Sequence, residues 1–505
     1  MLGSFTSFAG ALALFMVASV NAQVPPCGGS VYNGTGTFTV MNYGTDYTVL
    51  TMHGINNNPD TEDYLLYCGA AKPEPNALQA MGVSPTVKMF HVPVSTVLVS
   101  GTFTSSYVEL AGGQDKIRVL EDPLNIISPC LQVRVQNKDI NPLDTTNVTQ
   151  YASVDVGFRP LKSAEVKDVW VPMSVEVAPL LRVEYIKAVS LFFNTGTQAS
   201  IIYDTIIGSY NNLKNNMNNI PEANKRRIGW VKYSFVQKSW TLRNTAFTRG
   251  IIKDAGGIPF PLVGDELPGD EPSISPSDFK ILLMNADVII DQTDFSDGRL
   301  NYLSVFERWR ALAGITGIDF IPRVVDMKKV YSLDNTVNNV GISDYQYRMP
   351  SRPDLLLRDL IAVQYPLYNP GYKIRFLNSN FQYGQGPGNR AGPNNCSTTV
   401  PANEVPFPYN SGDITTSPLD PSFSGLAAPP PAEGGGIYGI GGASPGDGAS
   451  GSGKSKTTSI IIAVVCVAAV LGAAFAFAFY KWSRRAKEDR FIELEEEMNN
   501  EIPLN

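Results

Sequence analysis

The residue types that most often carry catalysis or hold metal ions are scarce in this sequence. Only two histidines occur, His53 and His91, which argues against a His-rich metal site and against a Ser-His-Asp or Cys-His centre. We find no HExxH motif, no nucleophile elbow and no paired-carboxylate motif. The sequence therefore predicts no catalytic residues, no resident metal site and no cofactor.

Polar, aromatic and basic side chains instead gather where predicted strands end. In open α/β sheets, ligands bind beyond the carboxyl ends of the strands. Aromatic rings and guanidinium groups suit a bulky, flat or anionic chelate. With so few histidines, capture of a ready-made metal chelate is favoured over capture of a bare ion, with oxygen-only coordination through Asp and Tyr as the alternative. The candidate ligand-binding residues are Thr102, Ser105, Ser106, Tyr107, Met173, Glu176, Ser234, Trp240, Arg243, Asp291, Thr293, Asp294, Phe295 and Arg348.

One long helix is expected to position these residues, over 197–219. Its apolar residues repeat every three or four positions, as on one face of a helix: Ala199, Ile202, Ile206, Tyr210, Leu213 and Met217. Thr197 is the expected N-cap and Pro221 the stop. Such a helix spans roughly 33 Å. We expect it to join two lobes with a ligand cleft between them.

Strands alternate with helices on both sides of this helix, which predicts parallel sheets. Before it we expect an edge strand over 87–93, a strand over 96–99 and a helix to Leu110, capped by Thr104 or Ser105. A short amphipathic helix is expected over 183–193. After it, strands are expected at 228–233, 288–291 and 330–333, with helices at 244–255 and 353–365. The predicted fold is α/β, with two Rossmann-like βα lobes joined by one helix.

The expected domain organisation extends beyond the two lobes. A signal peptide over 1–22 precedes an N-terminal β extension at 23–86, a first lobe at 87–196, the helix at 197–219 and a second lobe at 220–383. A disordered stalk rich in Gly, Pro and Ser follows at 384–457. Residues 460–480 are uncharged and long enough to span a bilayer, and a basic cluster begins the tail at 481–505. These features predict a single-pass type I protein of the plasma or endosomal membrane.

Four cysteines precede the predicted span and would face an oxidising compartment: Cys27, Cys68, Cys130 and Cys396. They allow two disulfides with three possible connectivities, and the sequence does not choose among them. Asn33, Asn147 and Asn395 begin glycosylation acceptor triplets. The formal net charge of −7 argues against a nucleic-acid partner.

The order of the segments resembles a known family. Val92-Pro-Val-Ser-Thr-Val-Leu-Val with Leu110-Ala-Gly-Gly-Gln-Asp-Lys-Ile, and Ile228-Gly-Trp-Val-Lys-Tyr with Ile251-Ile-Lys-Asp-Ala-Gly-Gly, are similar to strand-and-helix units of periplasmic solute-binding proteins. Asn285-Ala-Asp-Val-Ile-Ile-Asp, and Val330-Tyr-Ser-Leu with Arg352-Pro-Asp-Leu-Leu-Leu-Arg-Asp-Leu, extend the likeness. These are the binding proteins of ABC importers for iron-siderophores, haem and cobalamin, in which a helix joins two lobes. The anchor and β extension make the chain more similar to eukaryotic, membrane-anchored versions.

The resemblance implies a non-enzymatic cell-surface receptor that captures an iron-siderophore or haem-type chelate. Uptake would then need an endocytic adaptor or a separate transporter, because one membrane helix forms no channel. A structural or adhesive surface glycoprotein that keeps the fold without a ligand is the alternative. An extracellular hydrolase is a lesser one.

Overall fold

The computed structural model describes residues 27–28, 33–34, 36–54, 60–172, 178–260, 272–293, 307, 309–310, 322–379, 389–390 and 396. The chain divides into two compact units, 1–431 and 432–505, and all described residues belong to the first. The predicted signal peptide, membrane span and tail, and most of the predicted stalk, lie outside the described residues. Within the part of the chain that is described, no helix combines the length and apolar character needed to cross a bilayer.

The first lobe begins with a four-stranded sheet. β1 (Phe38–Tyr43), β2 (Tyr47–His53) and β3 (Thr61–Tyr67) pair antiparallel in sequence order. After the short helix α1 (Pro75–Ala80), β4 (Lys88–His91) adds parallel to β3. The edge strand expected over 87–93 is therefore confirmed as β4, which completes the N-terminal sheet.

A five-stranded parallel sheet forms the rest of the first lobe. Its order is β7 (Asn141–Pro142), β6 (Ile117–Leu120), β5 (Val97–Val99), β8 (Val156–Arg159) and β9 (Asp168–Trp170). The predicted strand–helix–strand unit is confirmed as β5, α2 (Thr102–Leu110) and β6. Between β6 and β8 lie the helices α3 (Pro129–Gln136) and α4 (Val148–Ala152), and the single turns η1 (Gln114–Lys116) and η2 (Pro123–Asn125) flank β6. Both sheets share one core, in which Phe38 and Phe90 lie with Val97 and Phe158.

Two details of this lobe differ from expectation. The cap of α2 is Gly101, with a φ of 81° that favours glycine, and neither Thr104 nor Ser105 caps the helix. The helix expected over 183–193 is broken into α5 (Pro179–Val183), α6 (Tyr185–Ser190) and the turn η3 (Leu191–Phe193). All residues of α6 and η3 are buried, so this segment is a core element and is not amphipathic.

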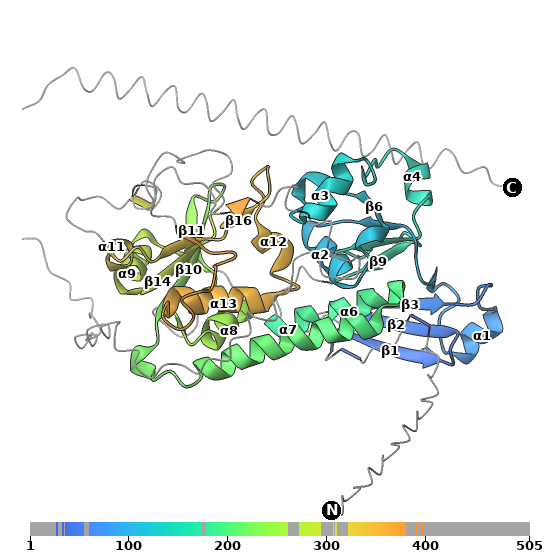
Figure 1. Ribbon diagram of the computed structural model, residues 1–505, viewed down its shortest axis with the longest axis horizontal. Helices are drawn as coiled ribbons and strands as arrows, with labels where there is room; N and C mark the ends of the chain where they lie inside the picture. The colour runs from blue at the N-terminus through green and yellow to red at the C-terminus, as the bar shows by residue number, and fades with distance from the viewer. Residues whose placement is uncertain are drawn as a thin grey trace, which may run out of the picture. The chain divides into compact units, whose positions relative to one another are not determined.

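The long helix is α7 (Gly196–Met217), of 22 residues. Thr197 lies inside it, and the N-cap is Thr195, whose hydroxyl donates to the carbonyl oxygen of Ala111 instead of capping. Its apolar face is divided between two cores. Ala199 and Ile206 belong to the core of the first lobe, whereas Tyr210 and Met217 belong to a core of the second lobe. The helix packs on α6 at one end and on α8 (Ala246–Asp254) and α13 (Pro353–Gln364) at the other (Figure 1).

The second lobe is built on a mixed sheet. The order is β13 (Ser273–Ile274), β11 (Ser239–Leu242), β10 (Arg227–Ser234), β14 (Val288–Asp291), β15 (Val330–Ser332) and β17 (Asn378–Ser379), with β12 (Ile258–Pro259) paired to β10. β10, β14 and β15 are parallel, as predicted. The other elements are the turn η4 (Glu222–Asn224), α9 (Pro276–Asn285), α11 (Arg323–Asp326), α12 (Asp344–Arg348) and the pair β16 (Thr336–Val337) and β18 (Asn389–Arg390).

Substitutions at two glycines test this packing. A Cβ placed on Gly113, in the turn after α2, would lie 2.2 Å from the ring of Phe193. We expect Gly113→Ala to lower the free energy of unfolding by about 1–3 kcal/mol, because the buried ring has to shift. Gly208, in the middle of α7, has open space at its Cβ position, and Gly208→Ala should raise the free energy of unfolding by about 0.5–1 kcal/mol.

Urea unfolding of the full-length chain, followed by circular dichroism, measures both effects. Equal effects of the two substitutions would contradict the packing described around Phe193.

Candidate functional site

The predicted site residues of the first lobe lie on α2 and are mostly buried. Thr102 is half-buried at the start of the helix, and Ser105, Ser106 and Tyr107 are buried. The Tyr107 hydroxyl donates to the carbonyl oxygen of Arg182 at 3.1 Å. These three residues therefore face neighbouring elements and not an open surface.

Three predicted residues of the second lobe surround the β10–β11 hairpin. The Ser234 hydroxyl accepts from the backbone amide of Gln237 at 3.1 Å. Trp240 is buried and stacks on Phe279, with ring centroids 4.2 Å apart. Arg243, just after β11, is half-buried. Trp240 thus serves the core of the lobe, while Ser234 and Arg243 remain nearer to solvent.

Asp291 and Thr293 hold the carboxyl end of β14 in place. The Asp291 carboxylate accepts from the backbone amide of Thr293 at 3.0 Å and from the indole of Trp309 at 2.9 Å. The Thr293 hydroxyl accepts from the backbone amide of Tyr233 at 2.9 Å. Both side chains are buried and support the sheet edge. The predicted residues Met173, Glu176, Asp294 and Phe295 lie outside the described residues.

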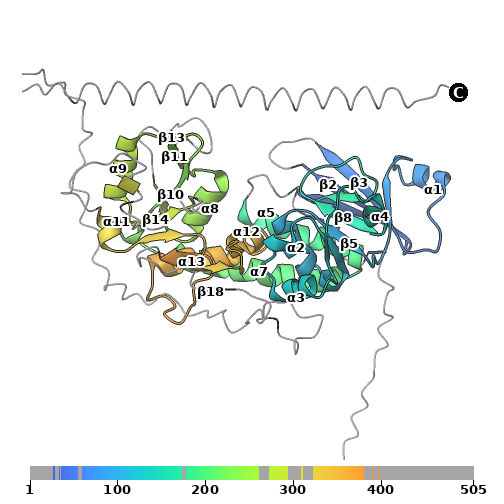
Figure 2. The same cartoon turned by 90° about the horizontal axis from the view of Figure 1, so that it is seen from above.

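The lobes meet where α12 packs on α2, which the two views in Figures 1 and 2 both show. The hydroxyls of Ser106 and Ser351 share a hydrogen bond of 2.5 Å. One helical turn further along α2, the Glu109 carboxylate accepts a short hydrogen bond from the Tyr347 hydroxyl. Of the residues predicted on the two lobes, the structure brings Ser106 and Arg348 to this one region.

A third contact lies beside these two. The side-chain amide of Asn338 donates to the carbonyl oxygens of Leu124 and Ile126 at 2.7 and 3.1 Å. We call these contacts the interlobe clasp, formed by Ser106, Glu109, Leu124 and Ile126 with Asn338, Tyr347 and Ser351. The clasp joins the segment that follows the carboxyl end of β15 to segments that follow the carboxyl ends of β5 and β6.

α12 reaches both lobes because it is a single short helix with two apolar sides. Tyr345 and Met349, four residues apart on one face, belong to a core of the second lobe. Tyr347, on the other side, is fully buried in the core of the first lobe. The helix therefore inserts one aromatic ring from the second lobe into the first.

Charged groups lie beside this ring. Asp344 is fully buried and pairs with Arg348 at 3.1 Å and Arg375 at 2.8 Å. Burial acts to raise the pKa of Asp344, but the two guanidinium groups outweigh it and hold that pKa below its ordinary value. Burial raises the pKa of Glu109, although the hydroxyls of Ser128 and Tyr347 and the charge of Arg348 act in the opposite direction.

The first turns of α2 also carry polar atoms that the protein does not fully satisfy. Among the described residues, no hydrogen-bond partner lies within reach of the buried hydroxyls of Thr104 and Ser105. Leaving a buried hydroxyl unpaired costs about 1–3 kcal/mol. The start of α2 therefore holds two buried hydroxyls with no partner among the described residues.

The sequence did not identify Glu109, Asn338 or Ser351 as site residues. Glu109 carries a usable signal, because it stands three residues after Ser106 on a helix whose other residues from Thr104 to Leu110 are uncharged and buried. Asn338 and Ser351 carry none, because their partners lie more than 200 residues away in the sequence.

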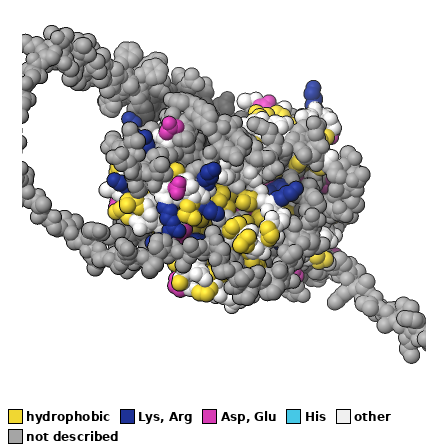
Figure 3. All heavy atoms as spheres, turned by 60° about the vertical axis from the view of Figure 1, so that its left-hand side comes forward, with side chains coloured by type: hydrophobic (Ala, Val, Ile, Leu, Met, Phe, Trp, Pro, Cys, Tyr) yellow, Lys and Arg dark blue, Asp and Glu magenta, His cyan; other side chains and the backbone are white. Residues whose placement is uncertain are grey.

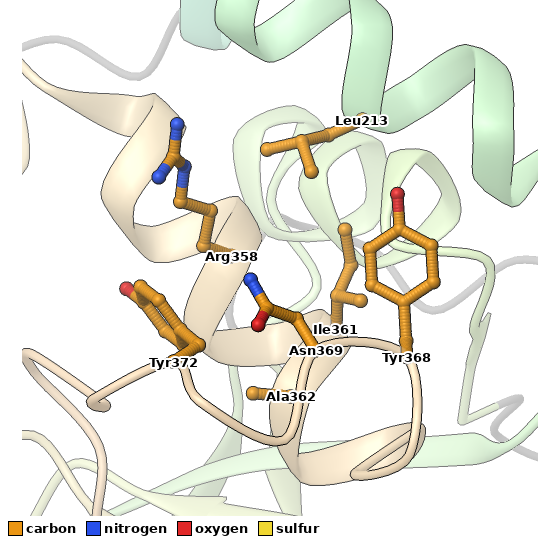
Figure 4. Close-up of a pocket in the computed structure, with 7 residues that line it drawn as sticks. All are labelled: Leu213, Arg358, Ile361, Ala362, Tyr368, Asn369 and Tyr372. Carbon is orange, nitrogen blue, oxygen red and sulfur yellow. The ribbon is translucent and has the colours of Figure 1, made fainter. Parts of the chain in front are cut away.

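A surface pocket lies elsewhere, between α7, α13 and the loop after α13. It is lined by Leu213, Arg358, Ile361, Ala362, Tyr368, Asn369 and Tyr372 (Figure 4). The Tyr368 hydroxyl accepts from the side-chain amide of Asn216, and the Tyr372 hydroxyl donates to Asp359. These polar groups already have partners in the chain, and none of the predicted site residues lines the pocket.

Apolar side chains are exposed on the outer side of the second lobe. Ile281 and Met284 on α9, and Met327 after α11, are exposed. The side that carries these helices comes forward in Figure 3, where apolar side chains lie among lysines and arginines. This surface is separate from the clasp. Within the described residues, no group of three or more His, Cys, Asp or Glu side chains is arranged to hold a metal ion.

Comparisons with known proteins give matches only among solved structures. No protein-family model matches the chain, and no curated protein matches it. A periplasmic binding protein from Veillonella parvula matches at a TM-score of 0.41 and 10% identity, over 66% of this chain and 99% of that one. A possible iron-binding periplasmic protein from Staphylococcus epidermidis matches at 0.37 and 15%, over 54% and 99%. The periplasmic vitamin B12 binding protein of Vibrio cholerae matches at 0.36 and 11%, over 54% and 97%.

The matched structures are of the class that the sequence resembles. At these identities and TM-scores, the likeness carries no conclusion about the ligand of this chain.

We expect Glu109→Gln to remove a pH dependence from the stability of the protein. The raised pKa of Glu109 lies above the value of about 4.3 for an unfolded chain. The folded state therefore holds this proton more tightly, and the stability that Glu109 contributes is full below about pH 4 and is lost as the pH rises through the raised pKa. Glutamine cannot ionise, so the variant keeps this contribution.

Urea midpoints of the full-length chain between pH 4 and pH 8 provide the measurement. Wild type should lose stability relative to Glu109→Gln as the pH rises. Glu222→Gln, at an exposed position, controls for the loss of one negative charge. If the urea midpoints of wild type and Glu109→Gln differ by the same amount at every pH, the pKa of Glu109 is not raised in the folded protein.

Proposed function

We propose that this chain is a non-enzymatic binding protein that captures a small solute between its two lobes. The observation that carries the proposal is the interlobe clasp. Segments that follow the carboxyl ends of parallel strands in both lobes meet there, and this edge is where open α/β sheets bind ligands. The groups that meet are polar and buried.

The helix α7 supports the same function. Because one half of its apolar face belongs to each lobe, the lobes can rotate about it only to a limited degree. The clasp opposite this helix combines a few hydrogen bonds with the inserted ring of Tyr347. Each neutral hydrogen bond contributes only about 0.5–1.5 kcal/mol, and a modest hinge movement would open the clasp.

The ligand we propose is a metal chelate of the iron-siderophore or haem type. Arg243, just after β11, is half-buried, and a guanidinium can pair with anionic oxygens of a chelate. No cofactor is needed, since the chelate brings its own metal.

The cellular role follows from the sequence and stays a proposal. We propose a single-pass type I protein of the plasma or endosomal membrane, with both lobes on the extracellular or lumenal side. The two disulfides fit an oxidising compartment. The exposed acceptors Asn33 and Asn147 fit glycosylation, and Asn395 lies outside the described residues. Uptake would pass through an endocytic adaptor or a separate transporter.

A structural or adhesive surface glycoprotein is the second candidate. The direct contact of α2 with α12 favours it, because the lobes already touch where the ligand is expected to enter. The two candidates differ in whether any chelate binds.

The test is a titration of the full-length chain in detergent micelles with a ferric trihydroxamate, a ferric catecholate siderophore, haem and cobalamin. The chain has five tryptophans, whose fluorescence should be quenched saturably by at least one of these chelates. Absence of saturable quenching with all four would reject the proposal in favour of the second candidate.

Arg243→Gln provides a matched test of the site. We expect the Kd of the chelate that binds to rise about tenfold, because a hydrogen bond to a charged group contributes about 1.5–3 kcal/mol. Lys253→Gln removes the same charge from an exposed position at the end of α8 and should leave the Kd unchanged. Equal effects of the two variants would place the ligand away from Arg243.

A further inference from the structure

The disulfide between Cys130 and Cys396 joins the two lobes. Cys130 is the second residue of α3, and its neighbour Leu131 is buried in the core of the first lobe. Cys396 lies six residues after β18, which pairs with β16 of the second lobe. The Cα atoms of the two cysteines are 4.7 Å apart. The other disulfide, Cys27–Cys68, lies within the first lobe.

β16 is firmly attached to the second lobe. The Thr336 hydroxyl donates to the carbonyl oxygen of Arg375 at 2.9 Å. The backbone amide of Asn335 donates to the carbonyl oxygen of Phe376 at 3.0 Å. Phe376 is fully buried in a core of this lobe. The disulfide therefore completes a covalent ring that runs from the first lobe through α7 to the second lobe and back.

This second connection lies at the clasp. Asn338 follows β16 directly and donates to the carbonyl oxygens of Leu124 and Ile126, a few residues before Cys130. The disulfide thus bridges the lobes at the edge where the carboxyl ends of the strands meet. Both cysteines are half-buried, so this bridge lies near the surface of that edge.

We propose that the Cys130–Cys396 disulfide is a strap that limits how far the lobes separate at the clasp. Among the described residues, the lobes are also joined by the chain through α5 to α7, by the packing of α5 and α7 on α8 and α13, and by the clasp. With the disulfide, a covalent bond also holds α3 of the first lobe to the chain that follows β18. The strap acts on the lobes themselves, so it can be tested without a ligand, and its failure is distinguishable from failure of the binding proposal.

Amide hydrogen exchange on the full-length chain measures opening of the clasp. In the double variant Cys130→Ser with Cys396→Ser, peptides covering residues 338–351 should exchange at least tenfold faster than in wild type. The matched control, Cys27→Ser with Cys68→Ser, removes the disulfide that lies within the first lobe and should leave exchange over 338–351 at the wild-type rate. Equal acceleration in the two double variants would overturn the proposal.

A second variant keeps both disulfides and lengthens only the chain between β18 and Cys396. Insertion of six Gly/Ser residues after Arg390 should also accelerate exchange over 338–351, to a rate between wild type and the double variant. If the disulfide only stabilised the fold, the insertion would change its effect little, because loop-closure entropy changes slowly with loop length. Wild-type exchange in the lengthened chain would therefore overturn the proposal, even if the double variant fails to fold.

Discussion

The division of α7 between two hydrophobic cores is the constraint on which the rest of the structure depends. Ile206 and Tyr210 are one helical turn apart, yet they are buried in different lobes. Neither lobe can move along or around the helix without exposing apolar surface, at about 25 cal/mol per Å². The relative position of the strand ends, and hence the clasp between α2 and α12, is set by this shared helix.

The clasp uses a different kind of interaction from the cores it joins. It combines buried hydroxyls, a carboxylate and an amide with one inserted ring, Tyr347. Polar groups buried in this way are directional, so they fix the geometry of the contact while contributing little net free energy. Opening this contact would also expose the ring of Tyr347, which is fully buried in the core of the first lobe.

Local patterns in the sequence were sufficient to predict the elements but not their contacts. The period of the apolar residues predicted α7, and the alternation of strands and helices predicted the parallel strands of both sheets. The predicted helix N-caps were wrong. The N-cap of α2 is Gly101 and not Thr104 or Ser105, and the N-cap of α7 is Thr195 and not Thr197. Several residues can cap a helix, and tertiary packing decides which one does. The edge strand expected at β4 is confirmed, but its pairing with β3 was not predicted, because a strand of four residues does not specify its neighbour.

The contacts of the candidate site could likewise not be predicted from local patterns in the sequence. Proximity to a strand end selected Ser106 and Arg348, which lie at the contact between the lobes, and also Trp240 and Tyr107, which pack within a single lobe. Distance from a strand end does not say which way a side chain points. Glu109 and Tyr347 come together from positions 238 residues apart, and no local pattern contains that pairing.

The connectivity of the disulfides has a consequence for synthesis of the chain. Cys68 follows Cys27 by 41 residues, whereas Cys396 follows Cys130 by 266. At about 5–20 residues per second, the second interval lasts on the order of 10–50 s. During that time Cys130 has no native partner, and α7 is made before the second core that it helps to build. Oxidation of the nascent chain must therefore be slower at Cys130 than at Cys27 if the native pairing is to form without later rearrangement.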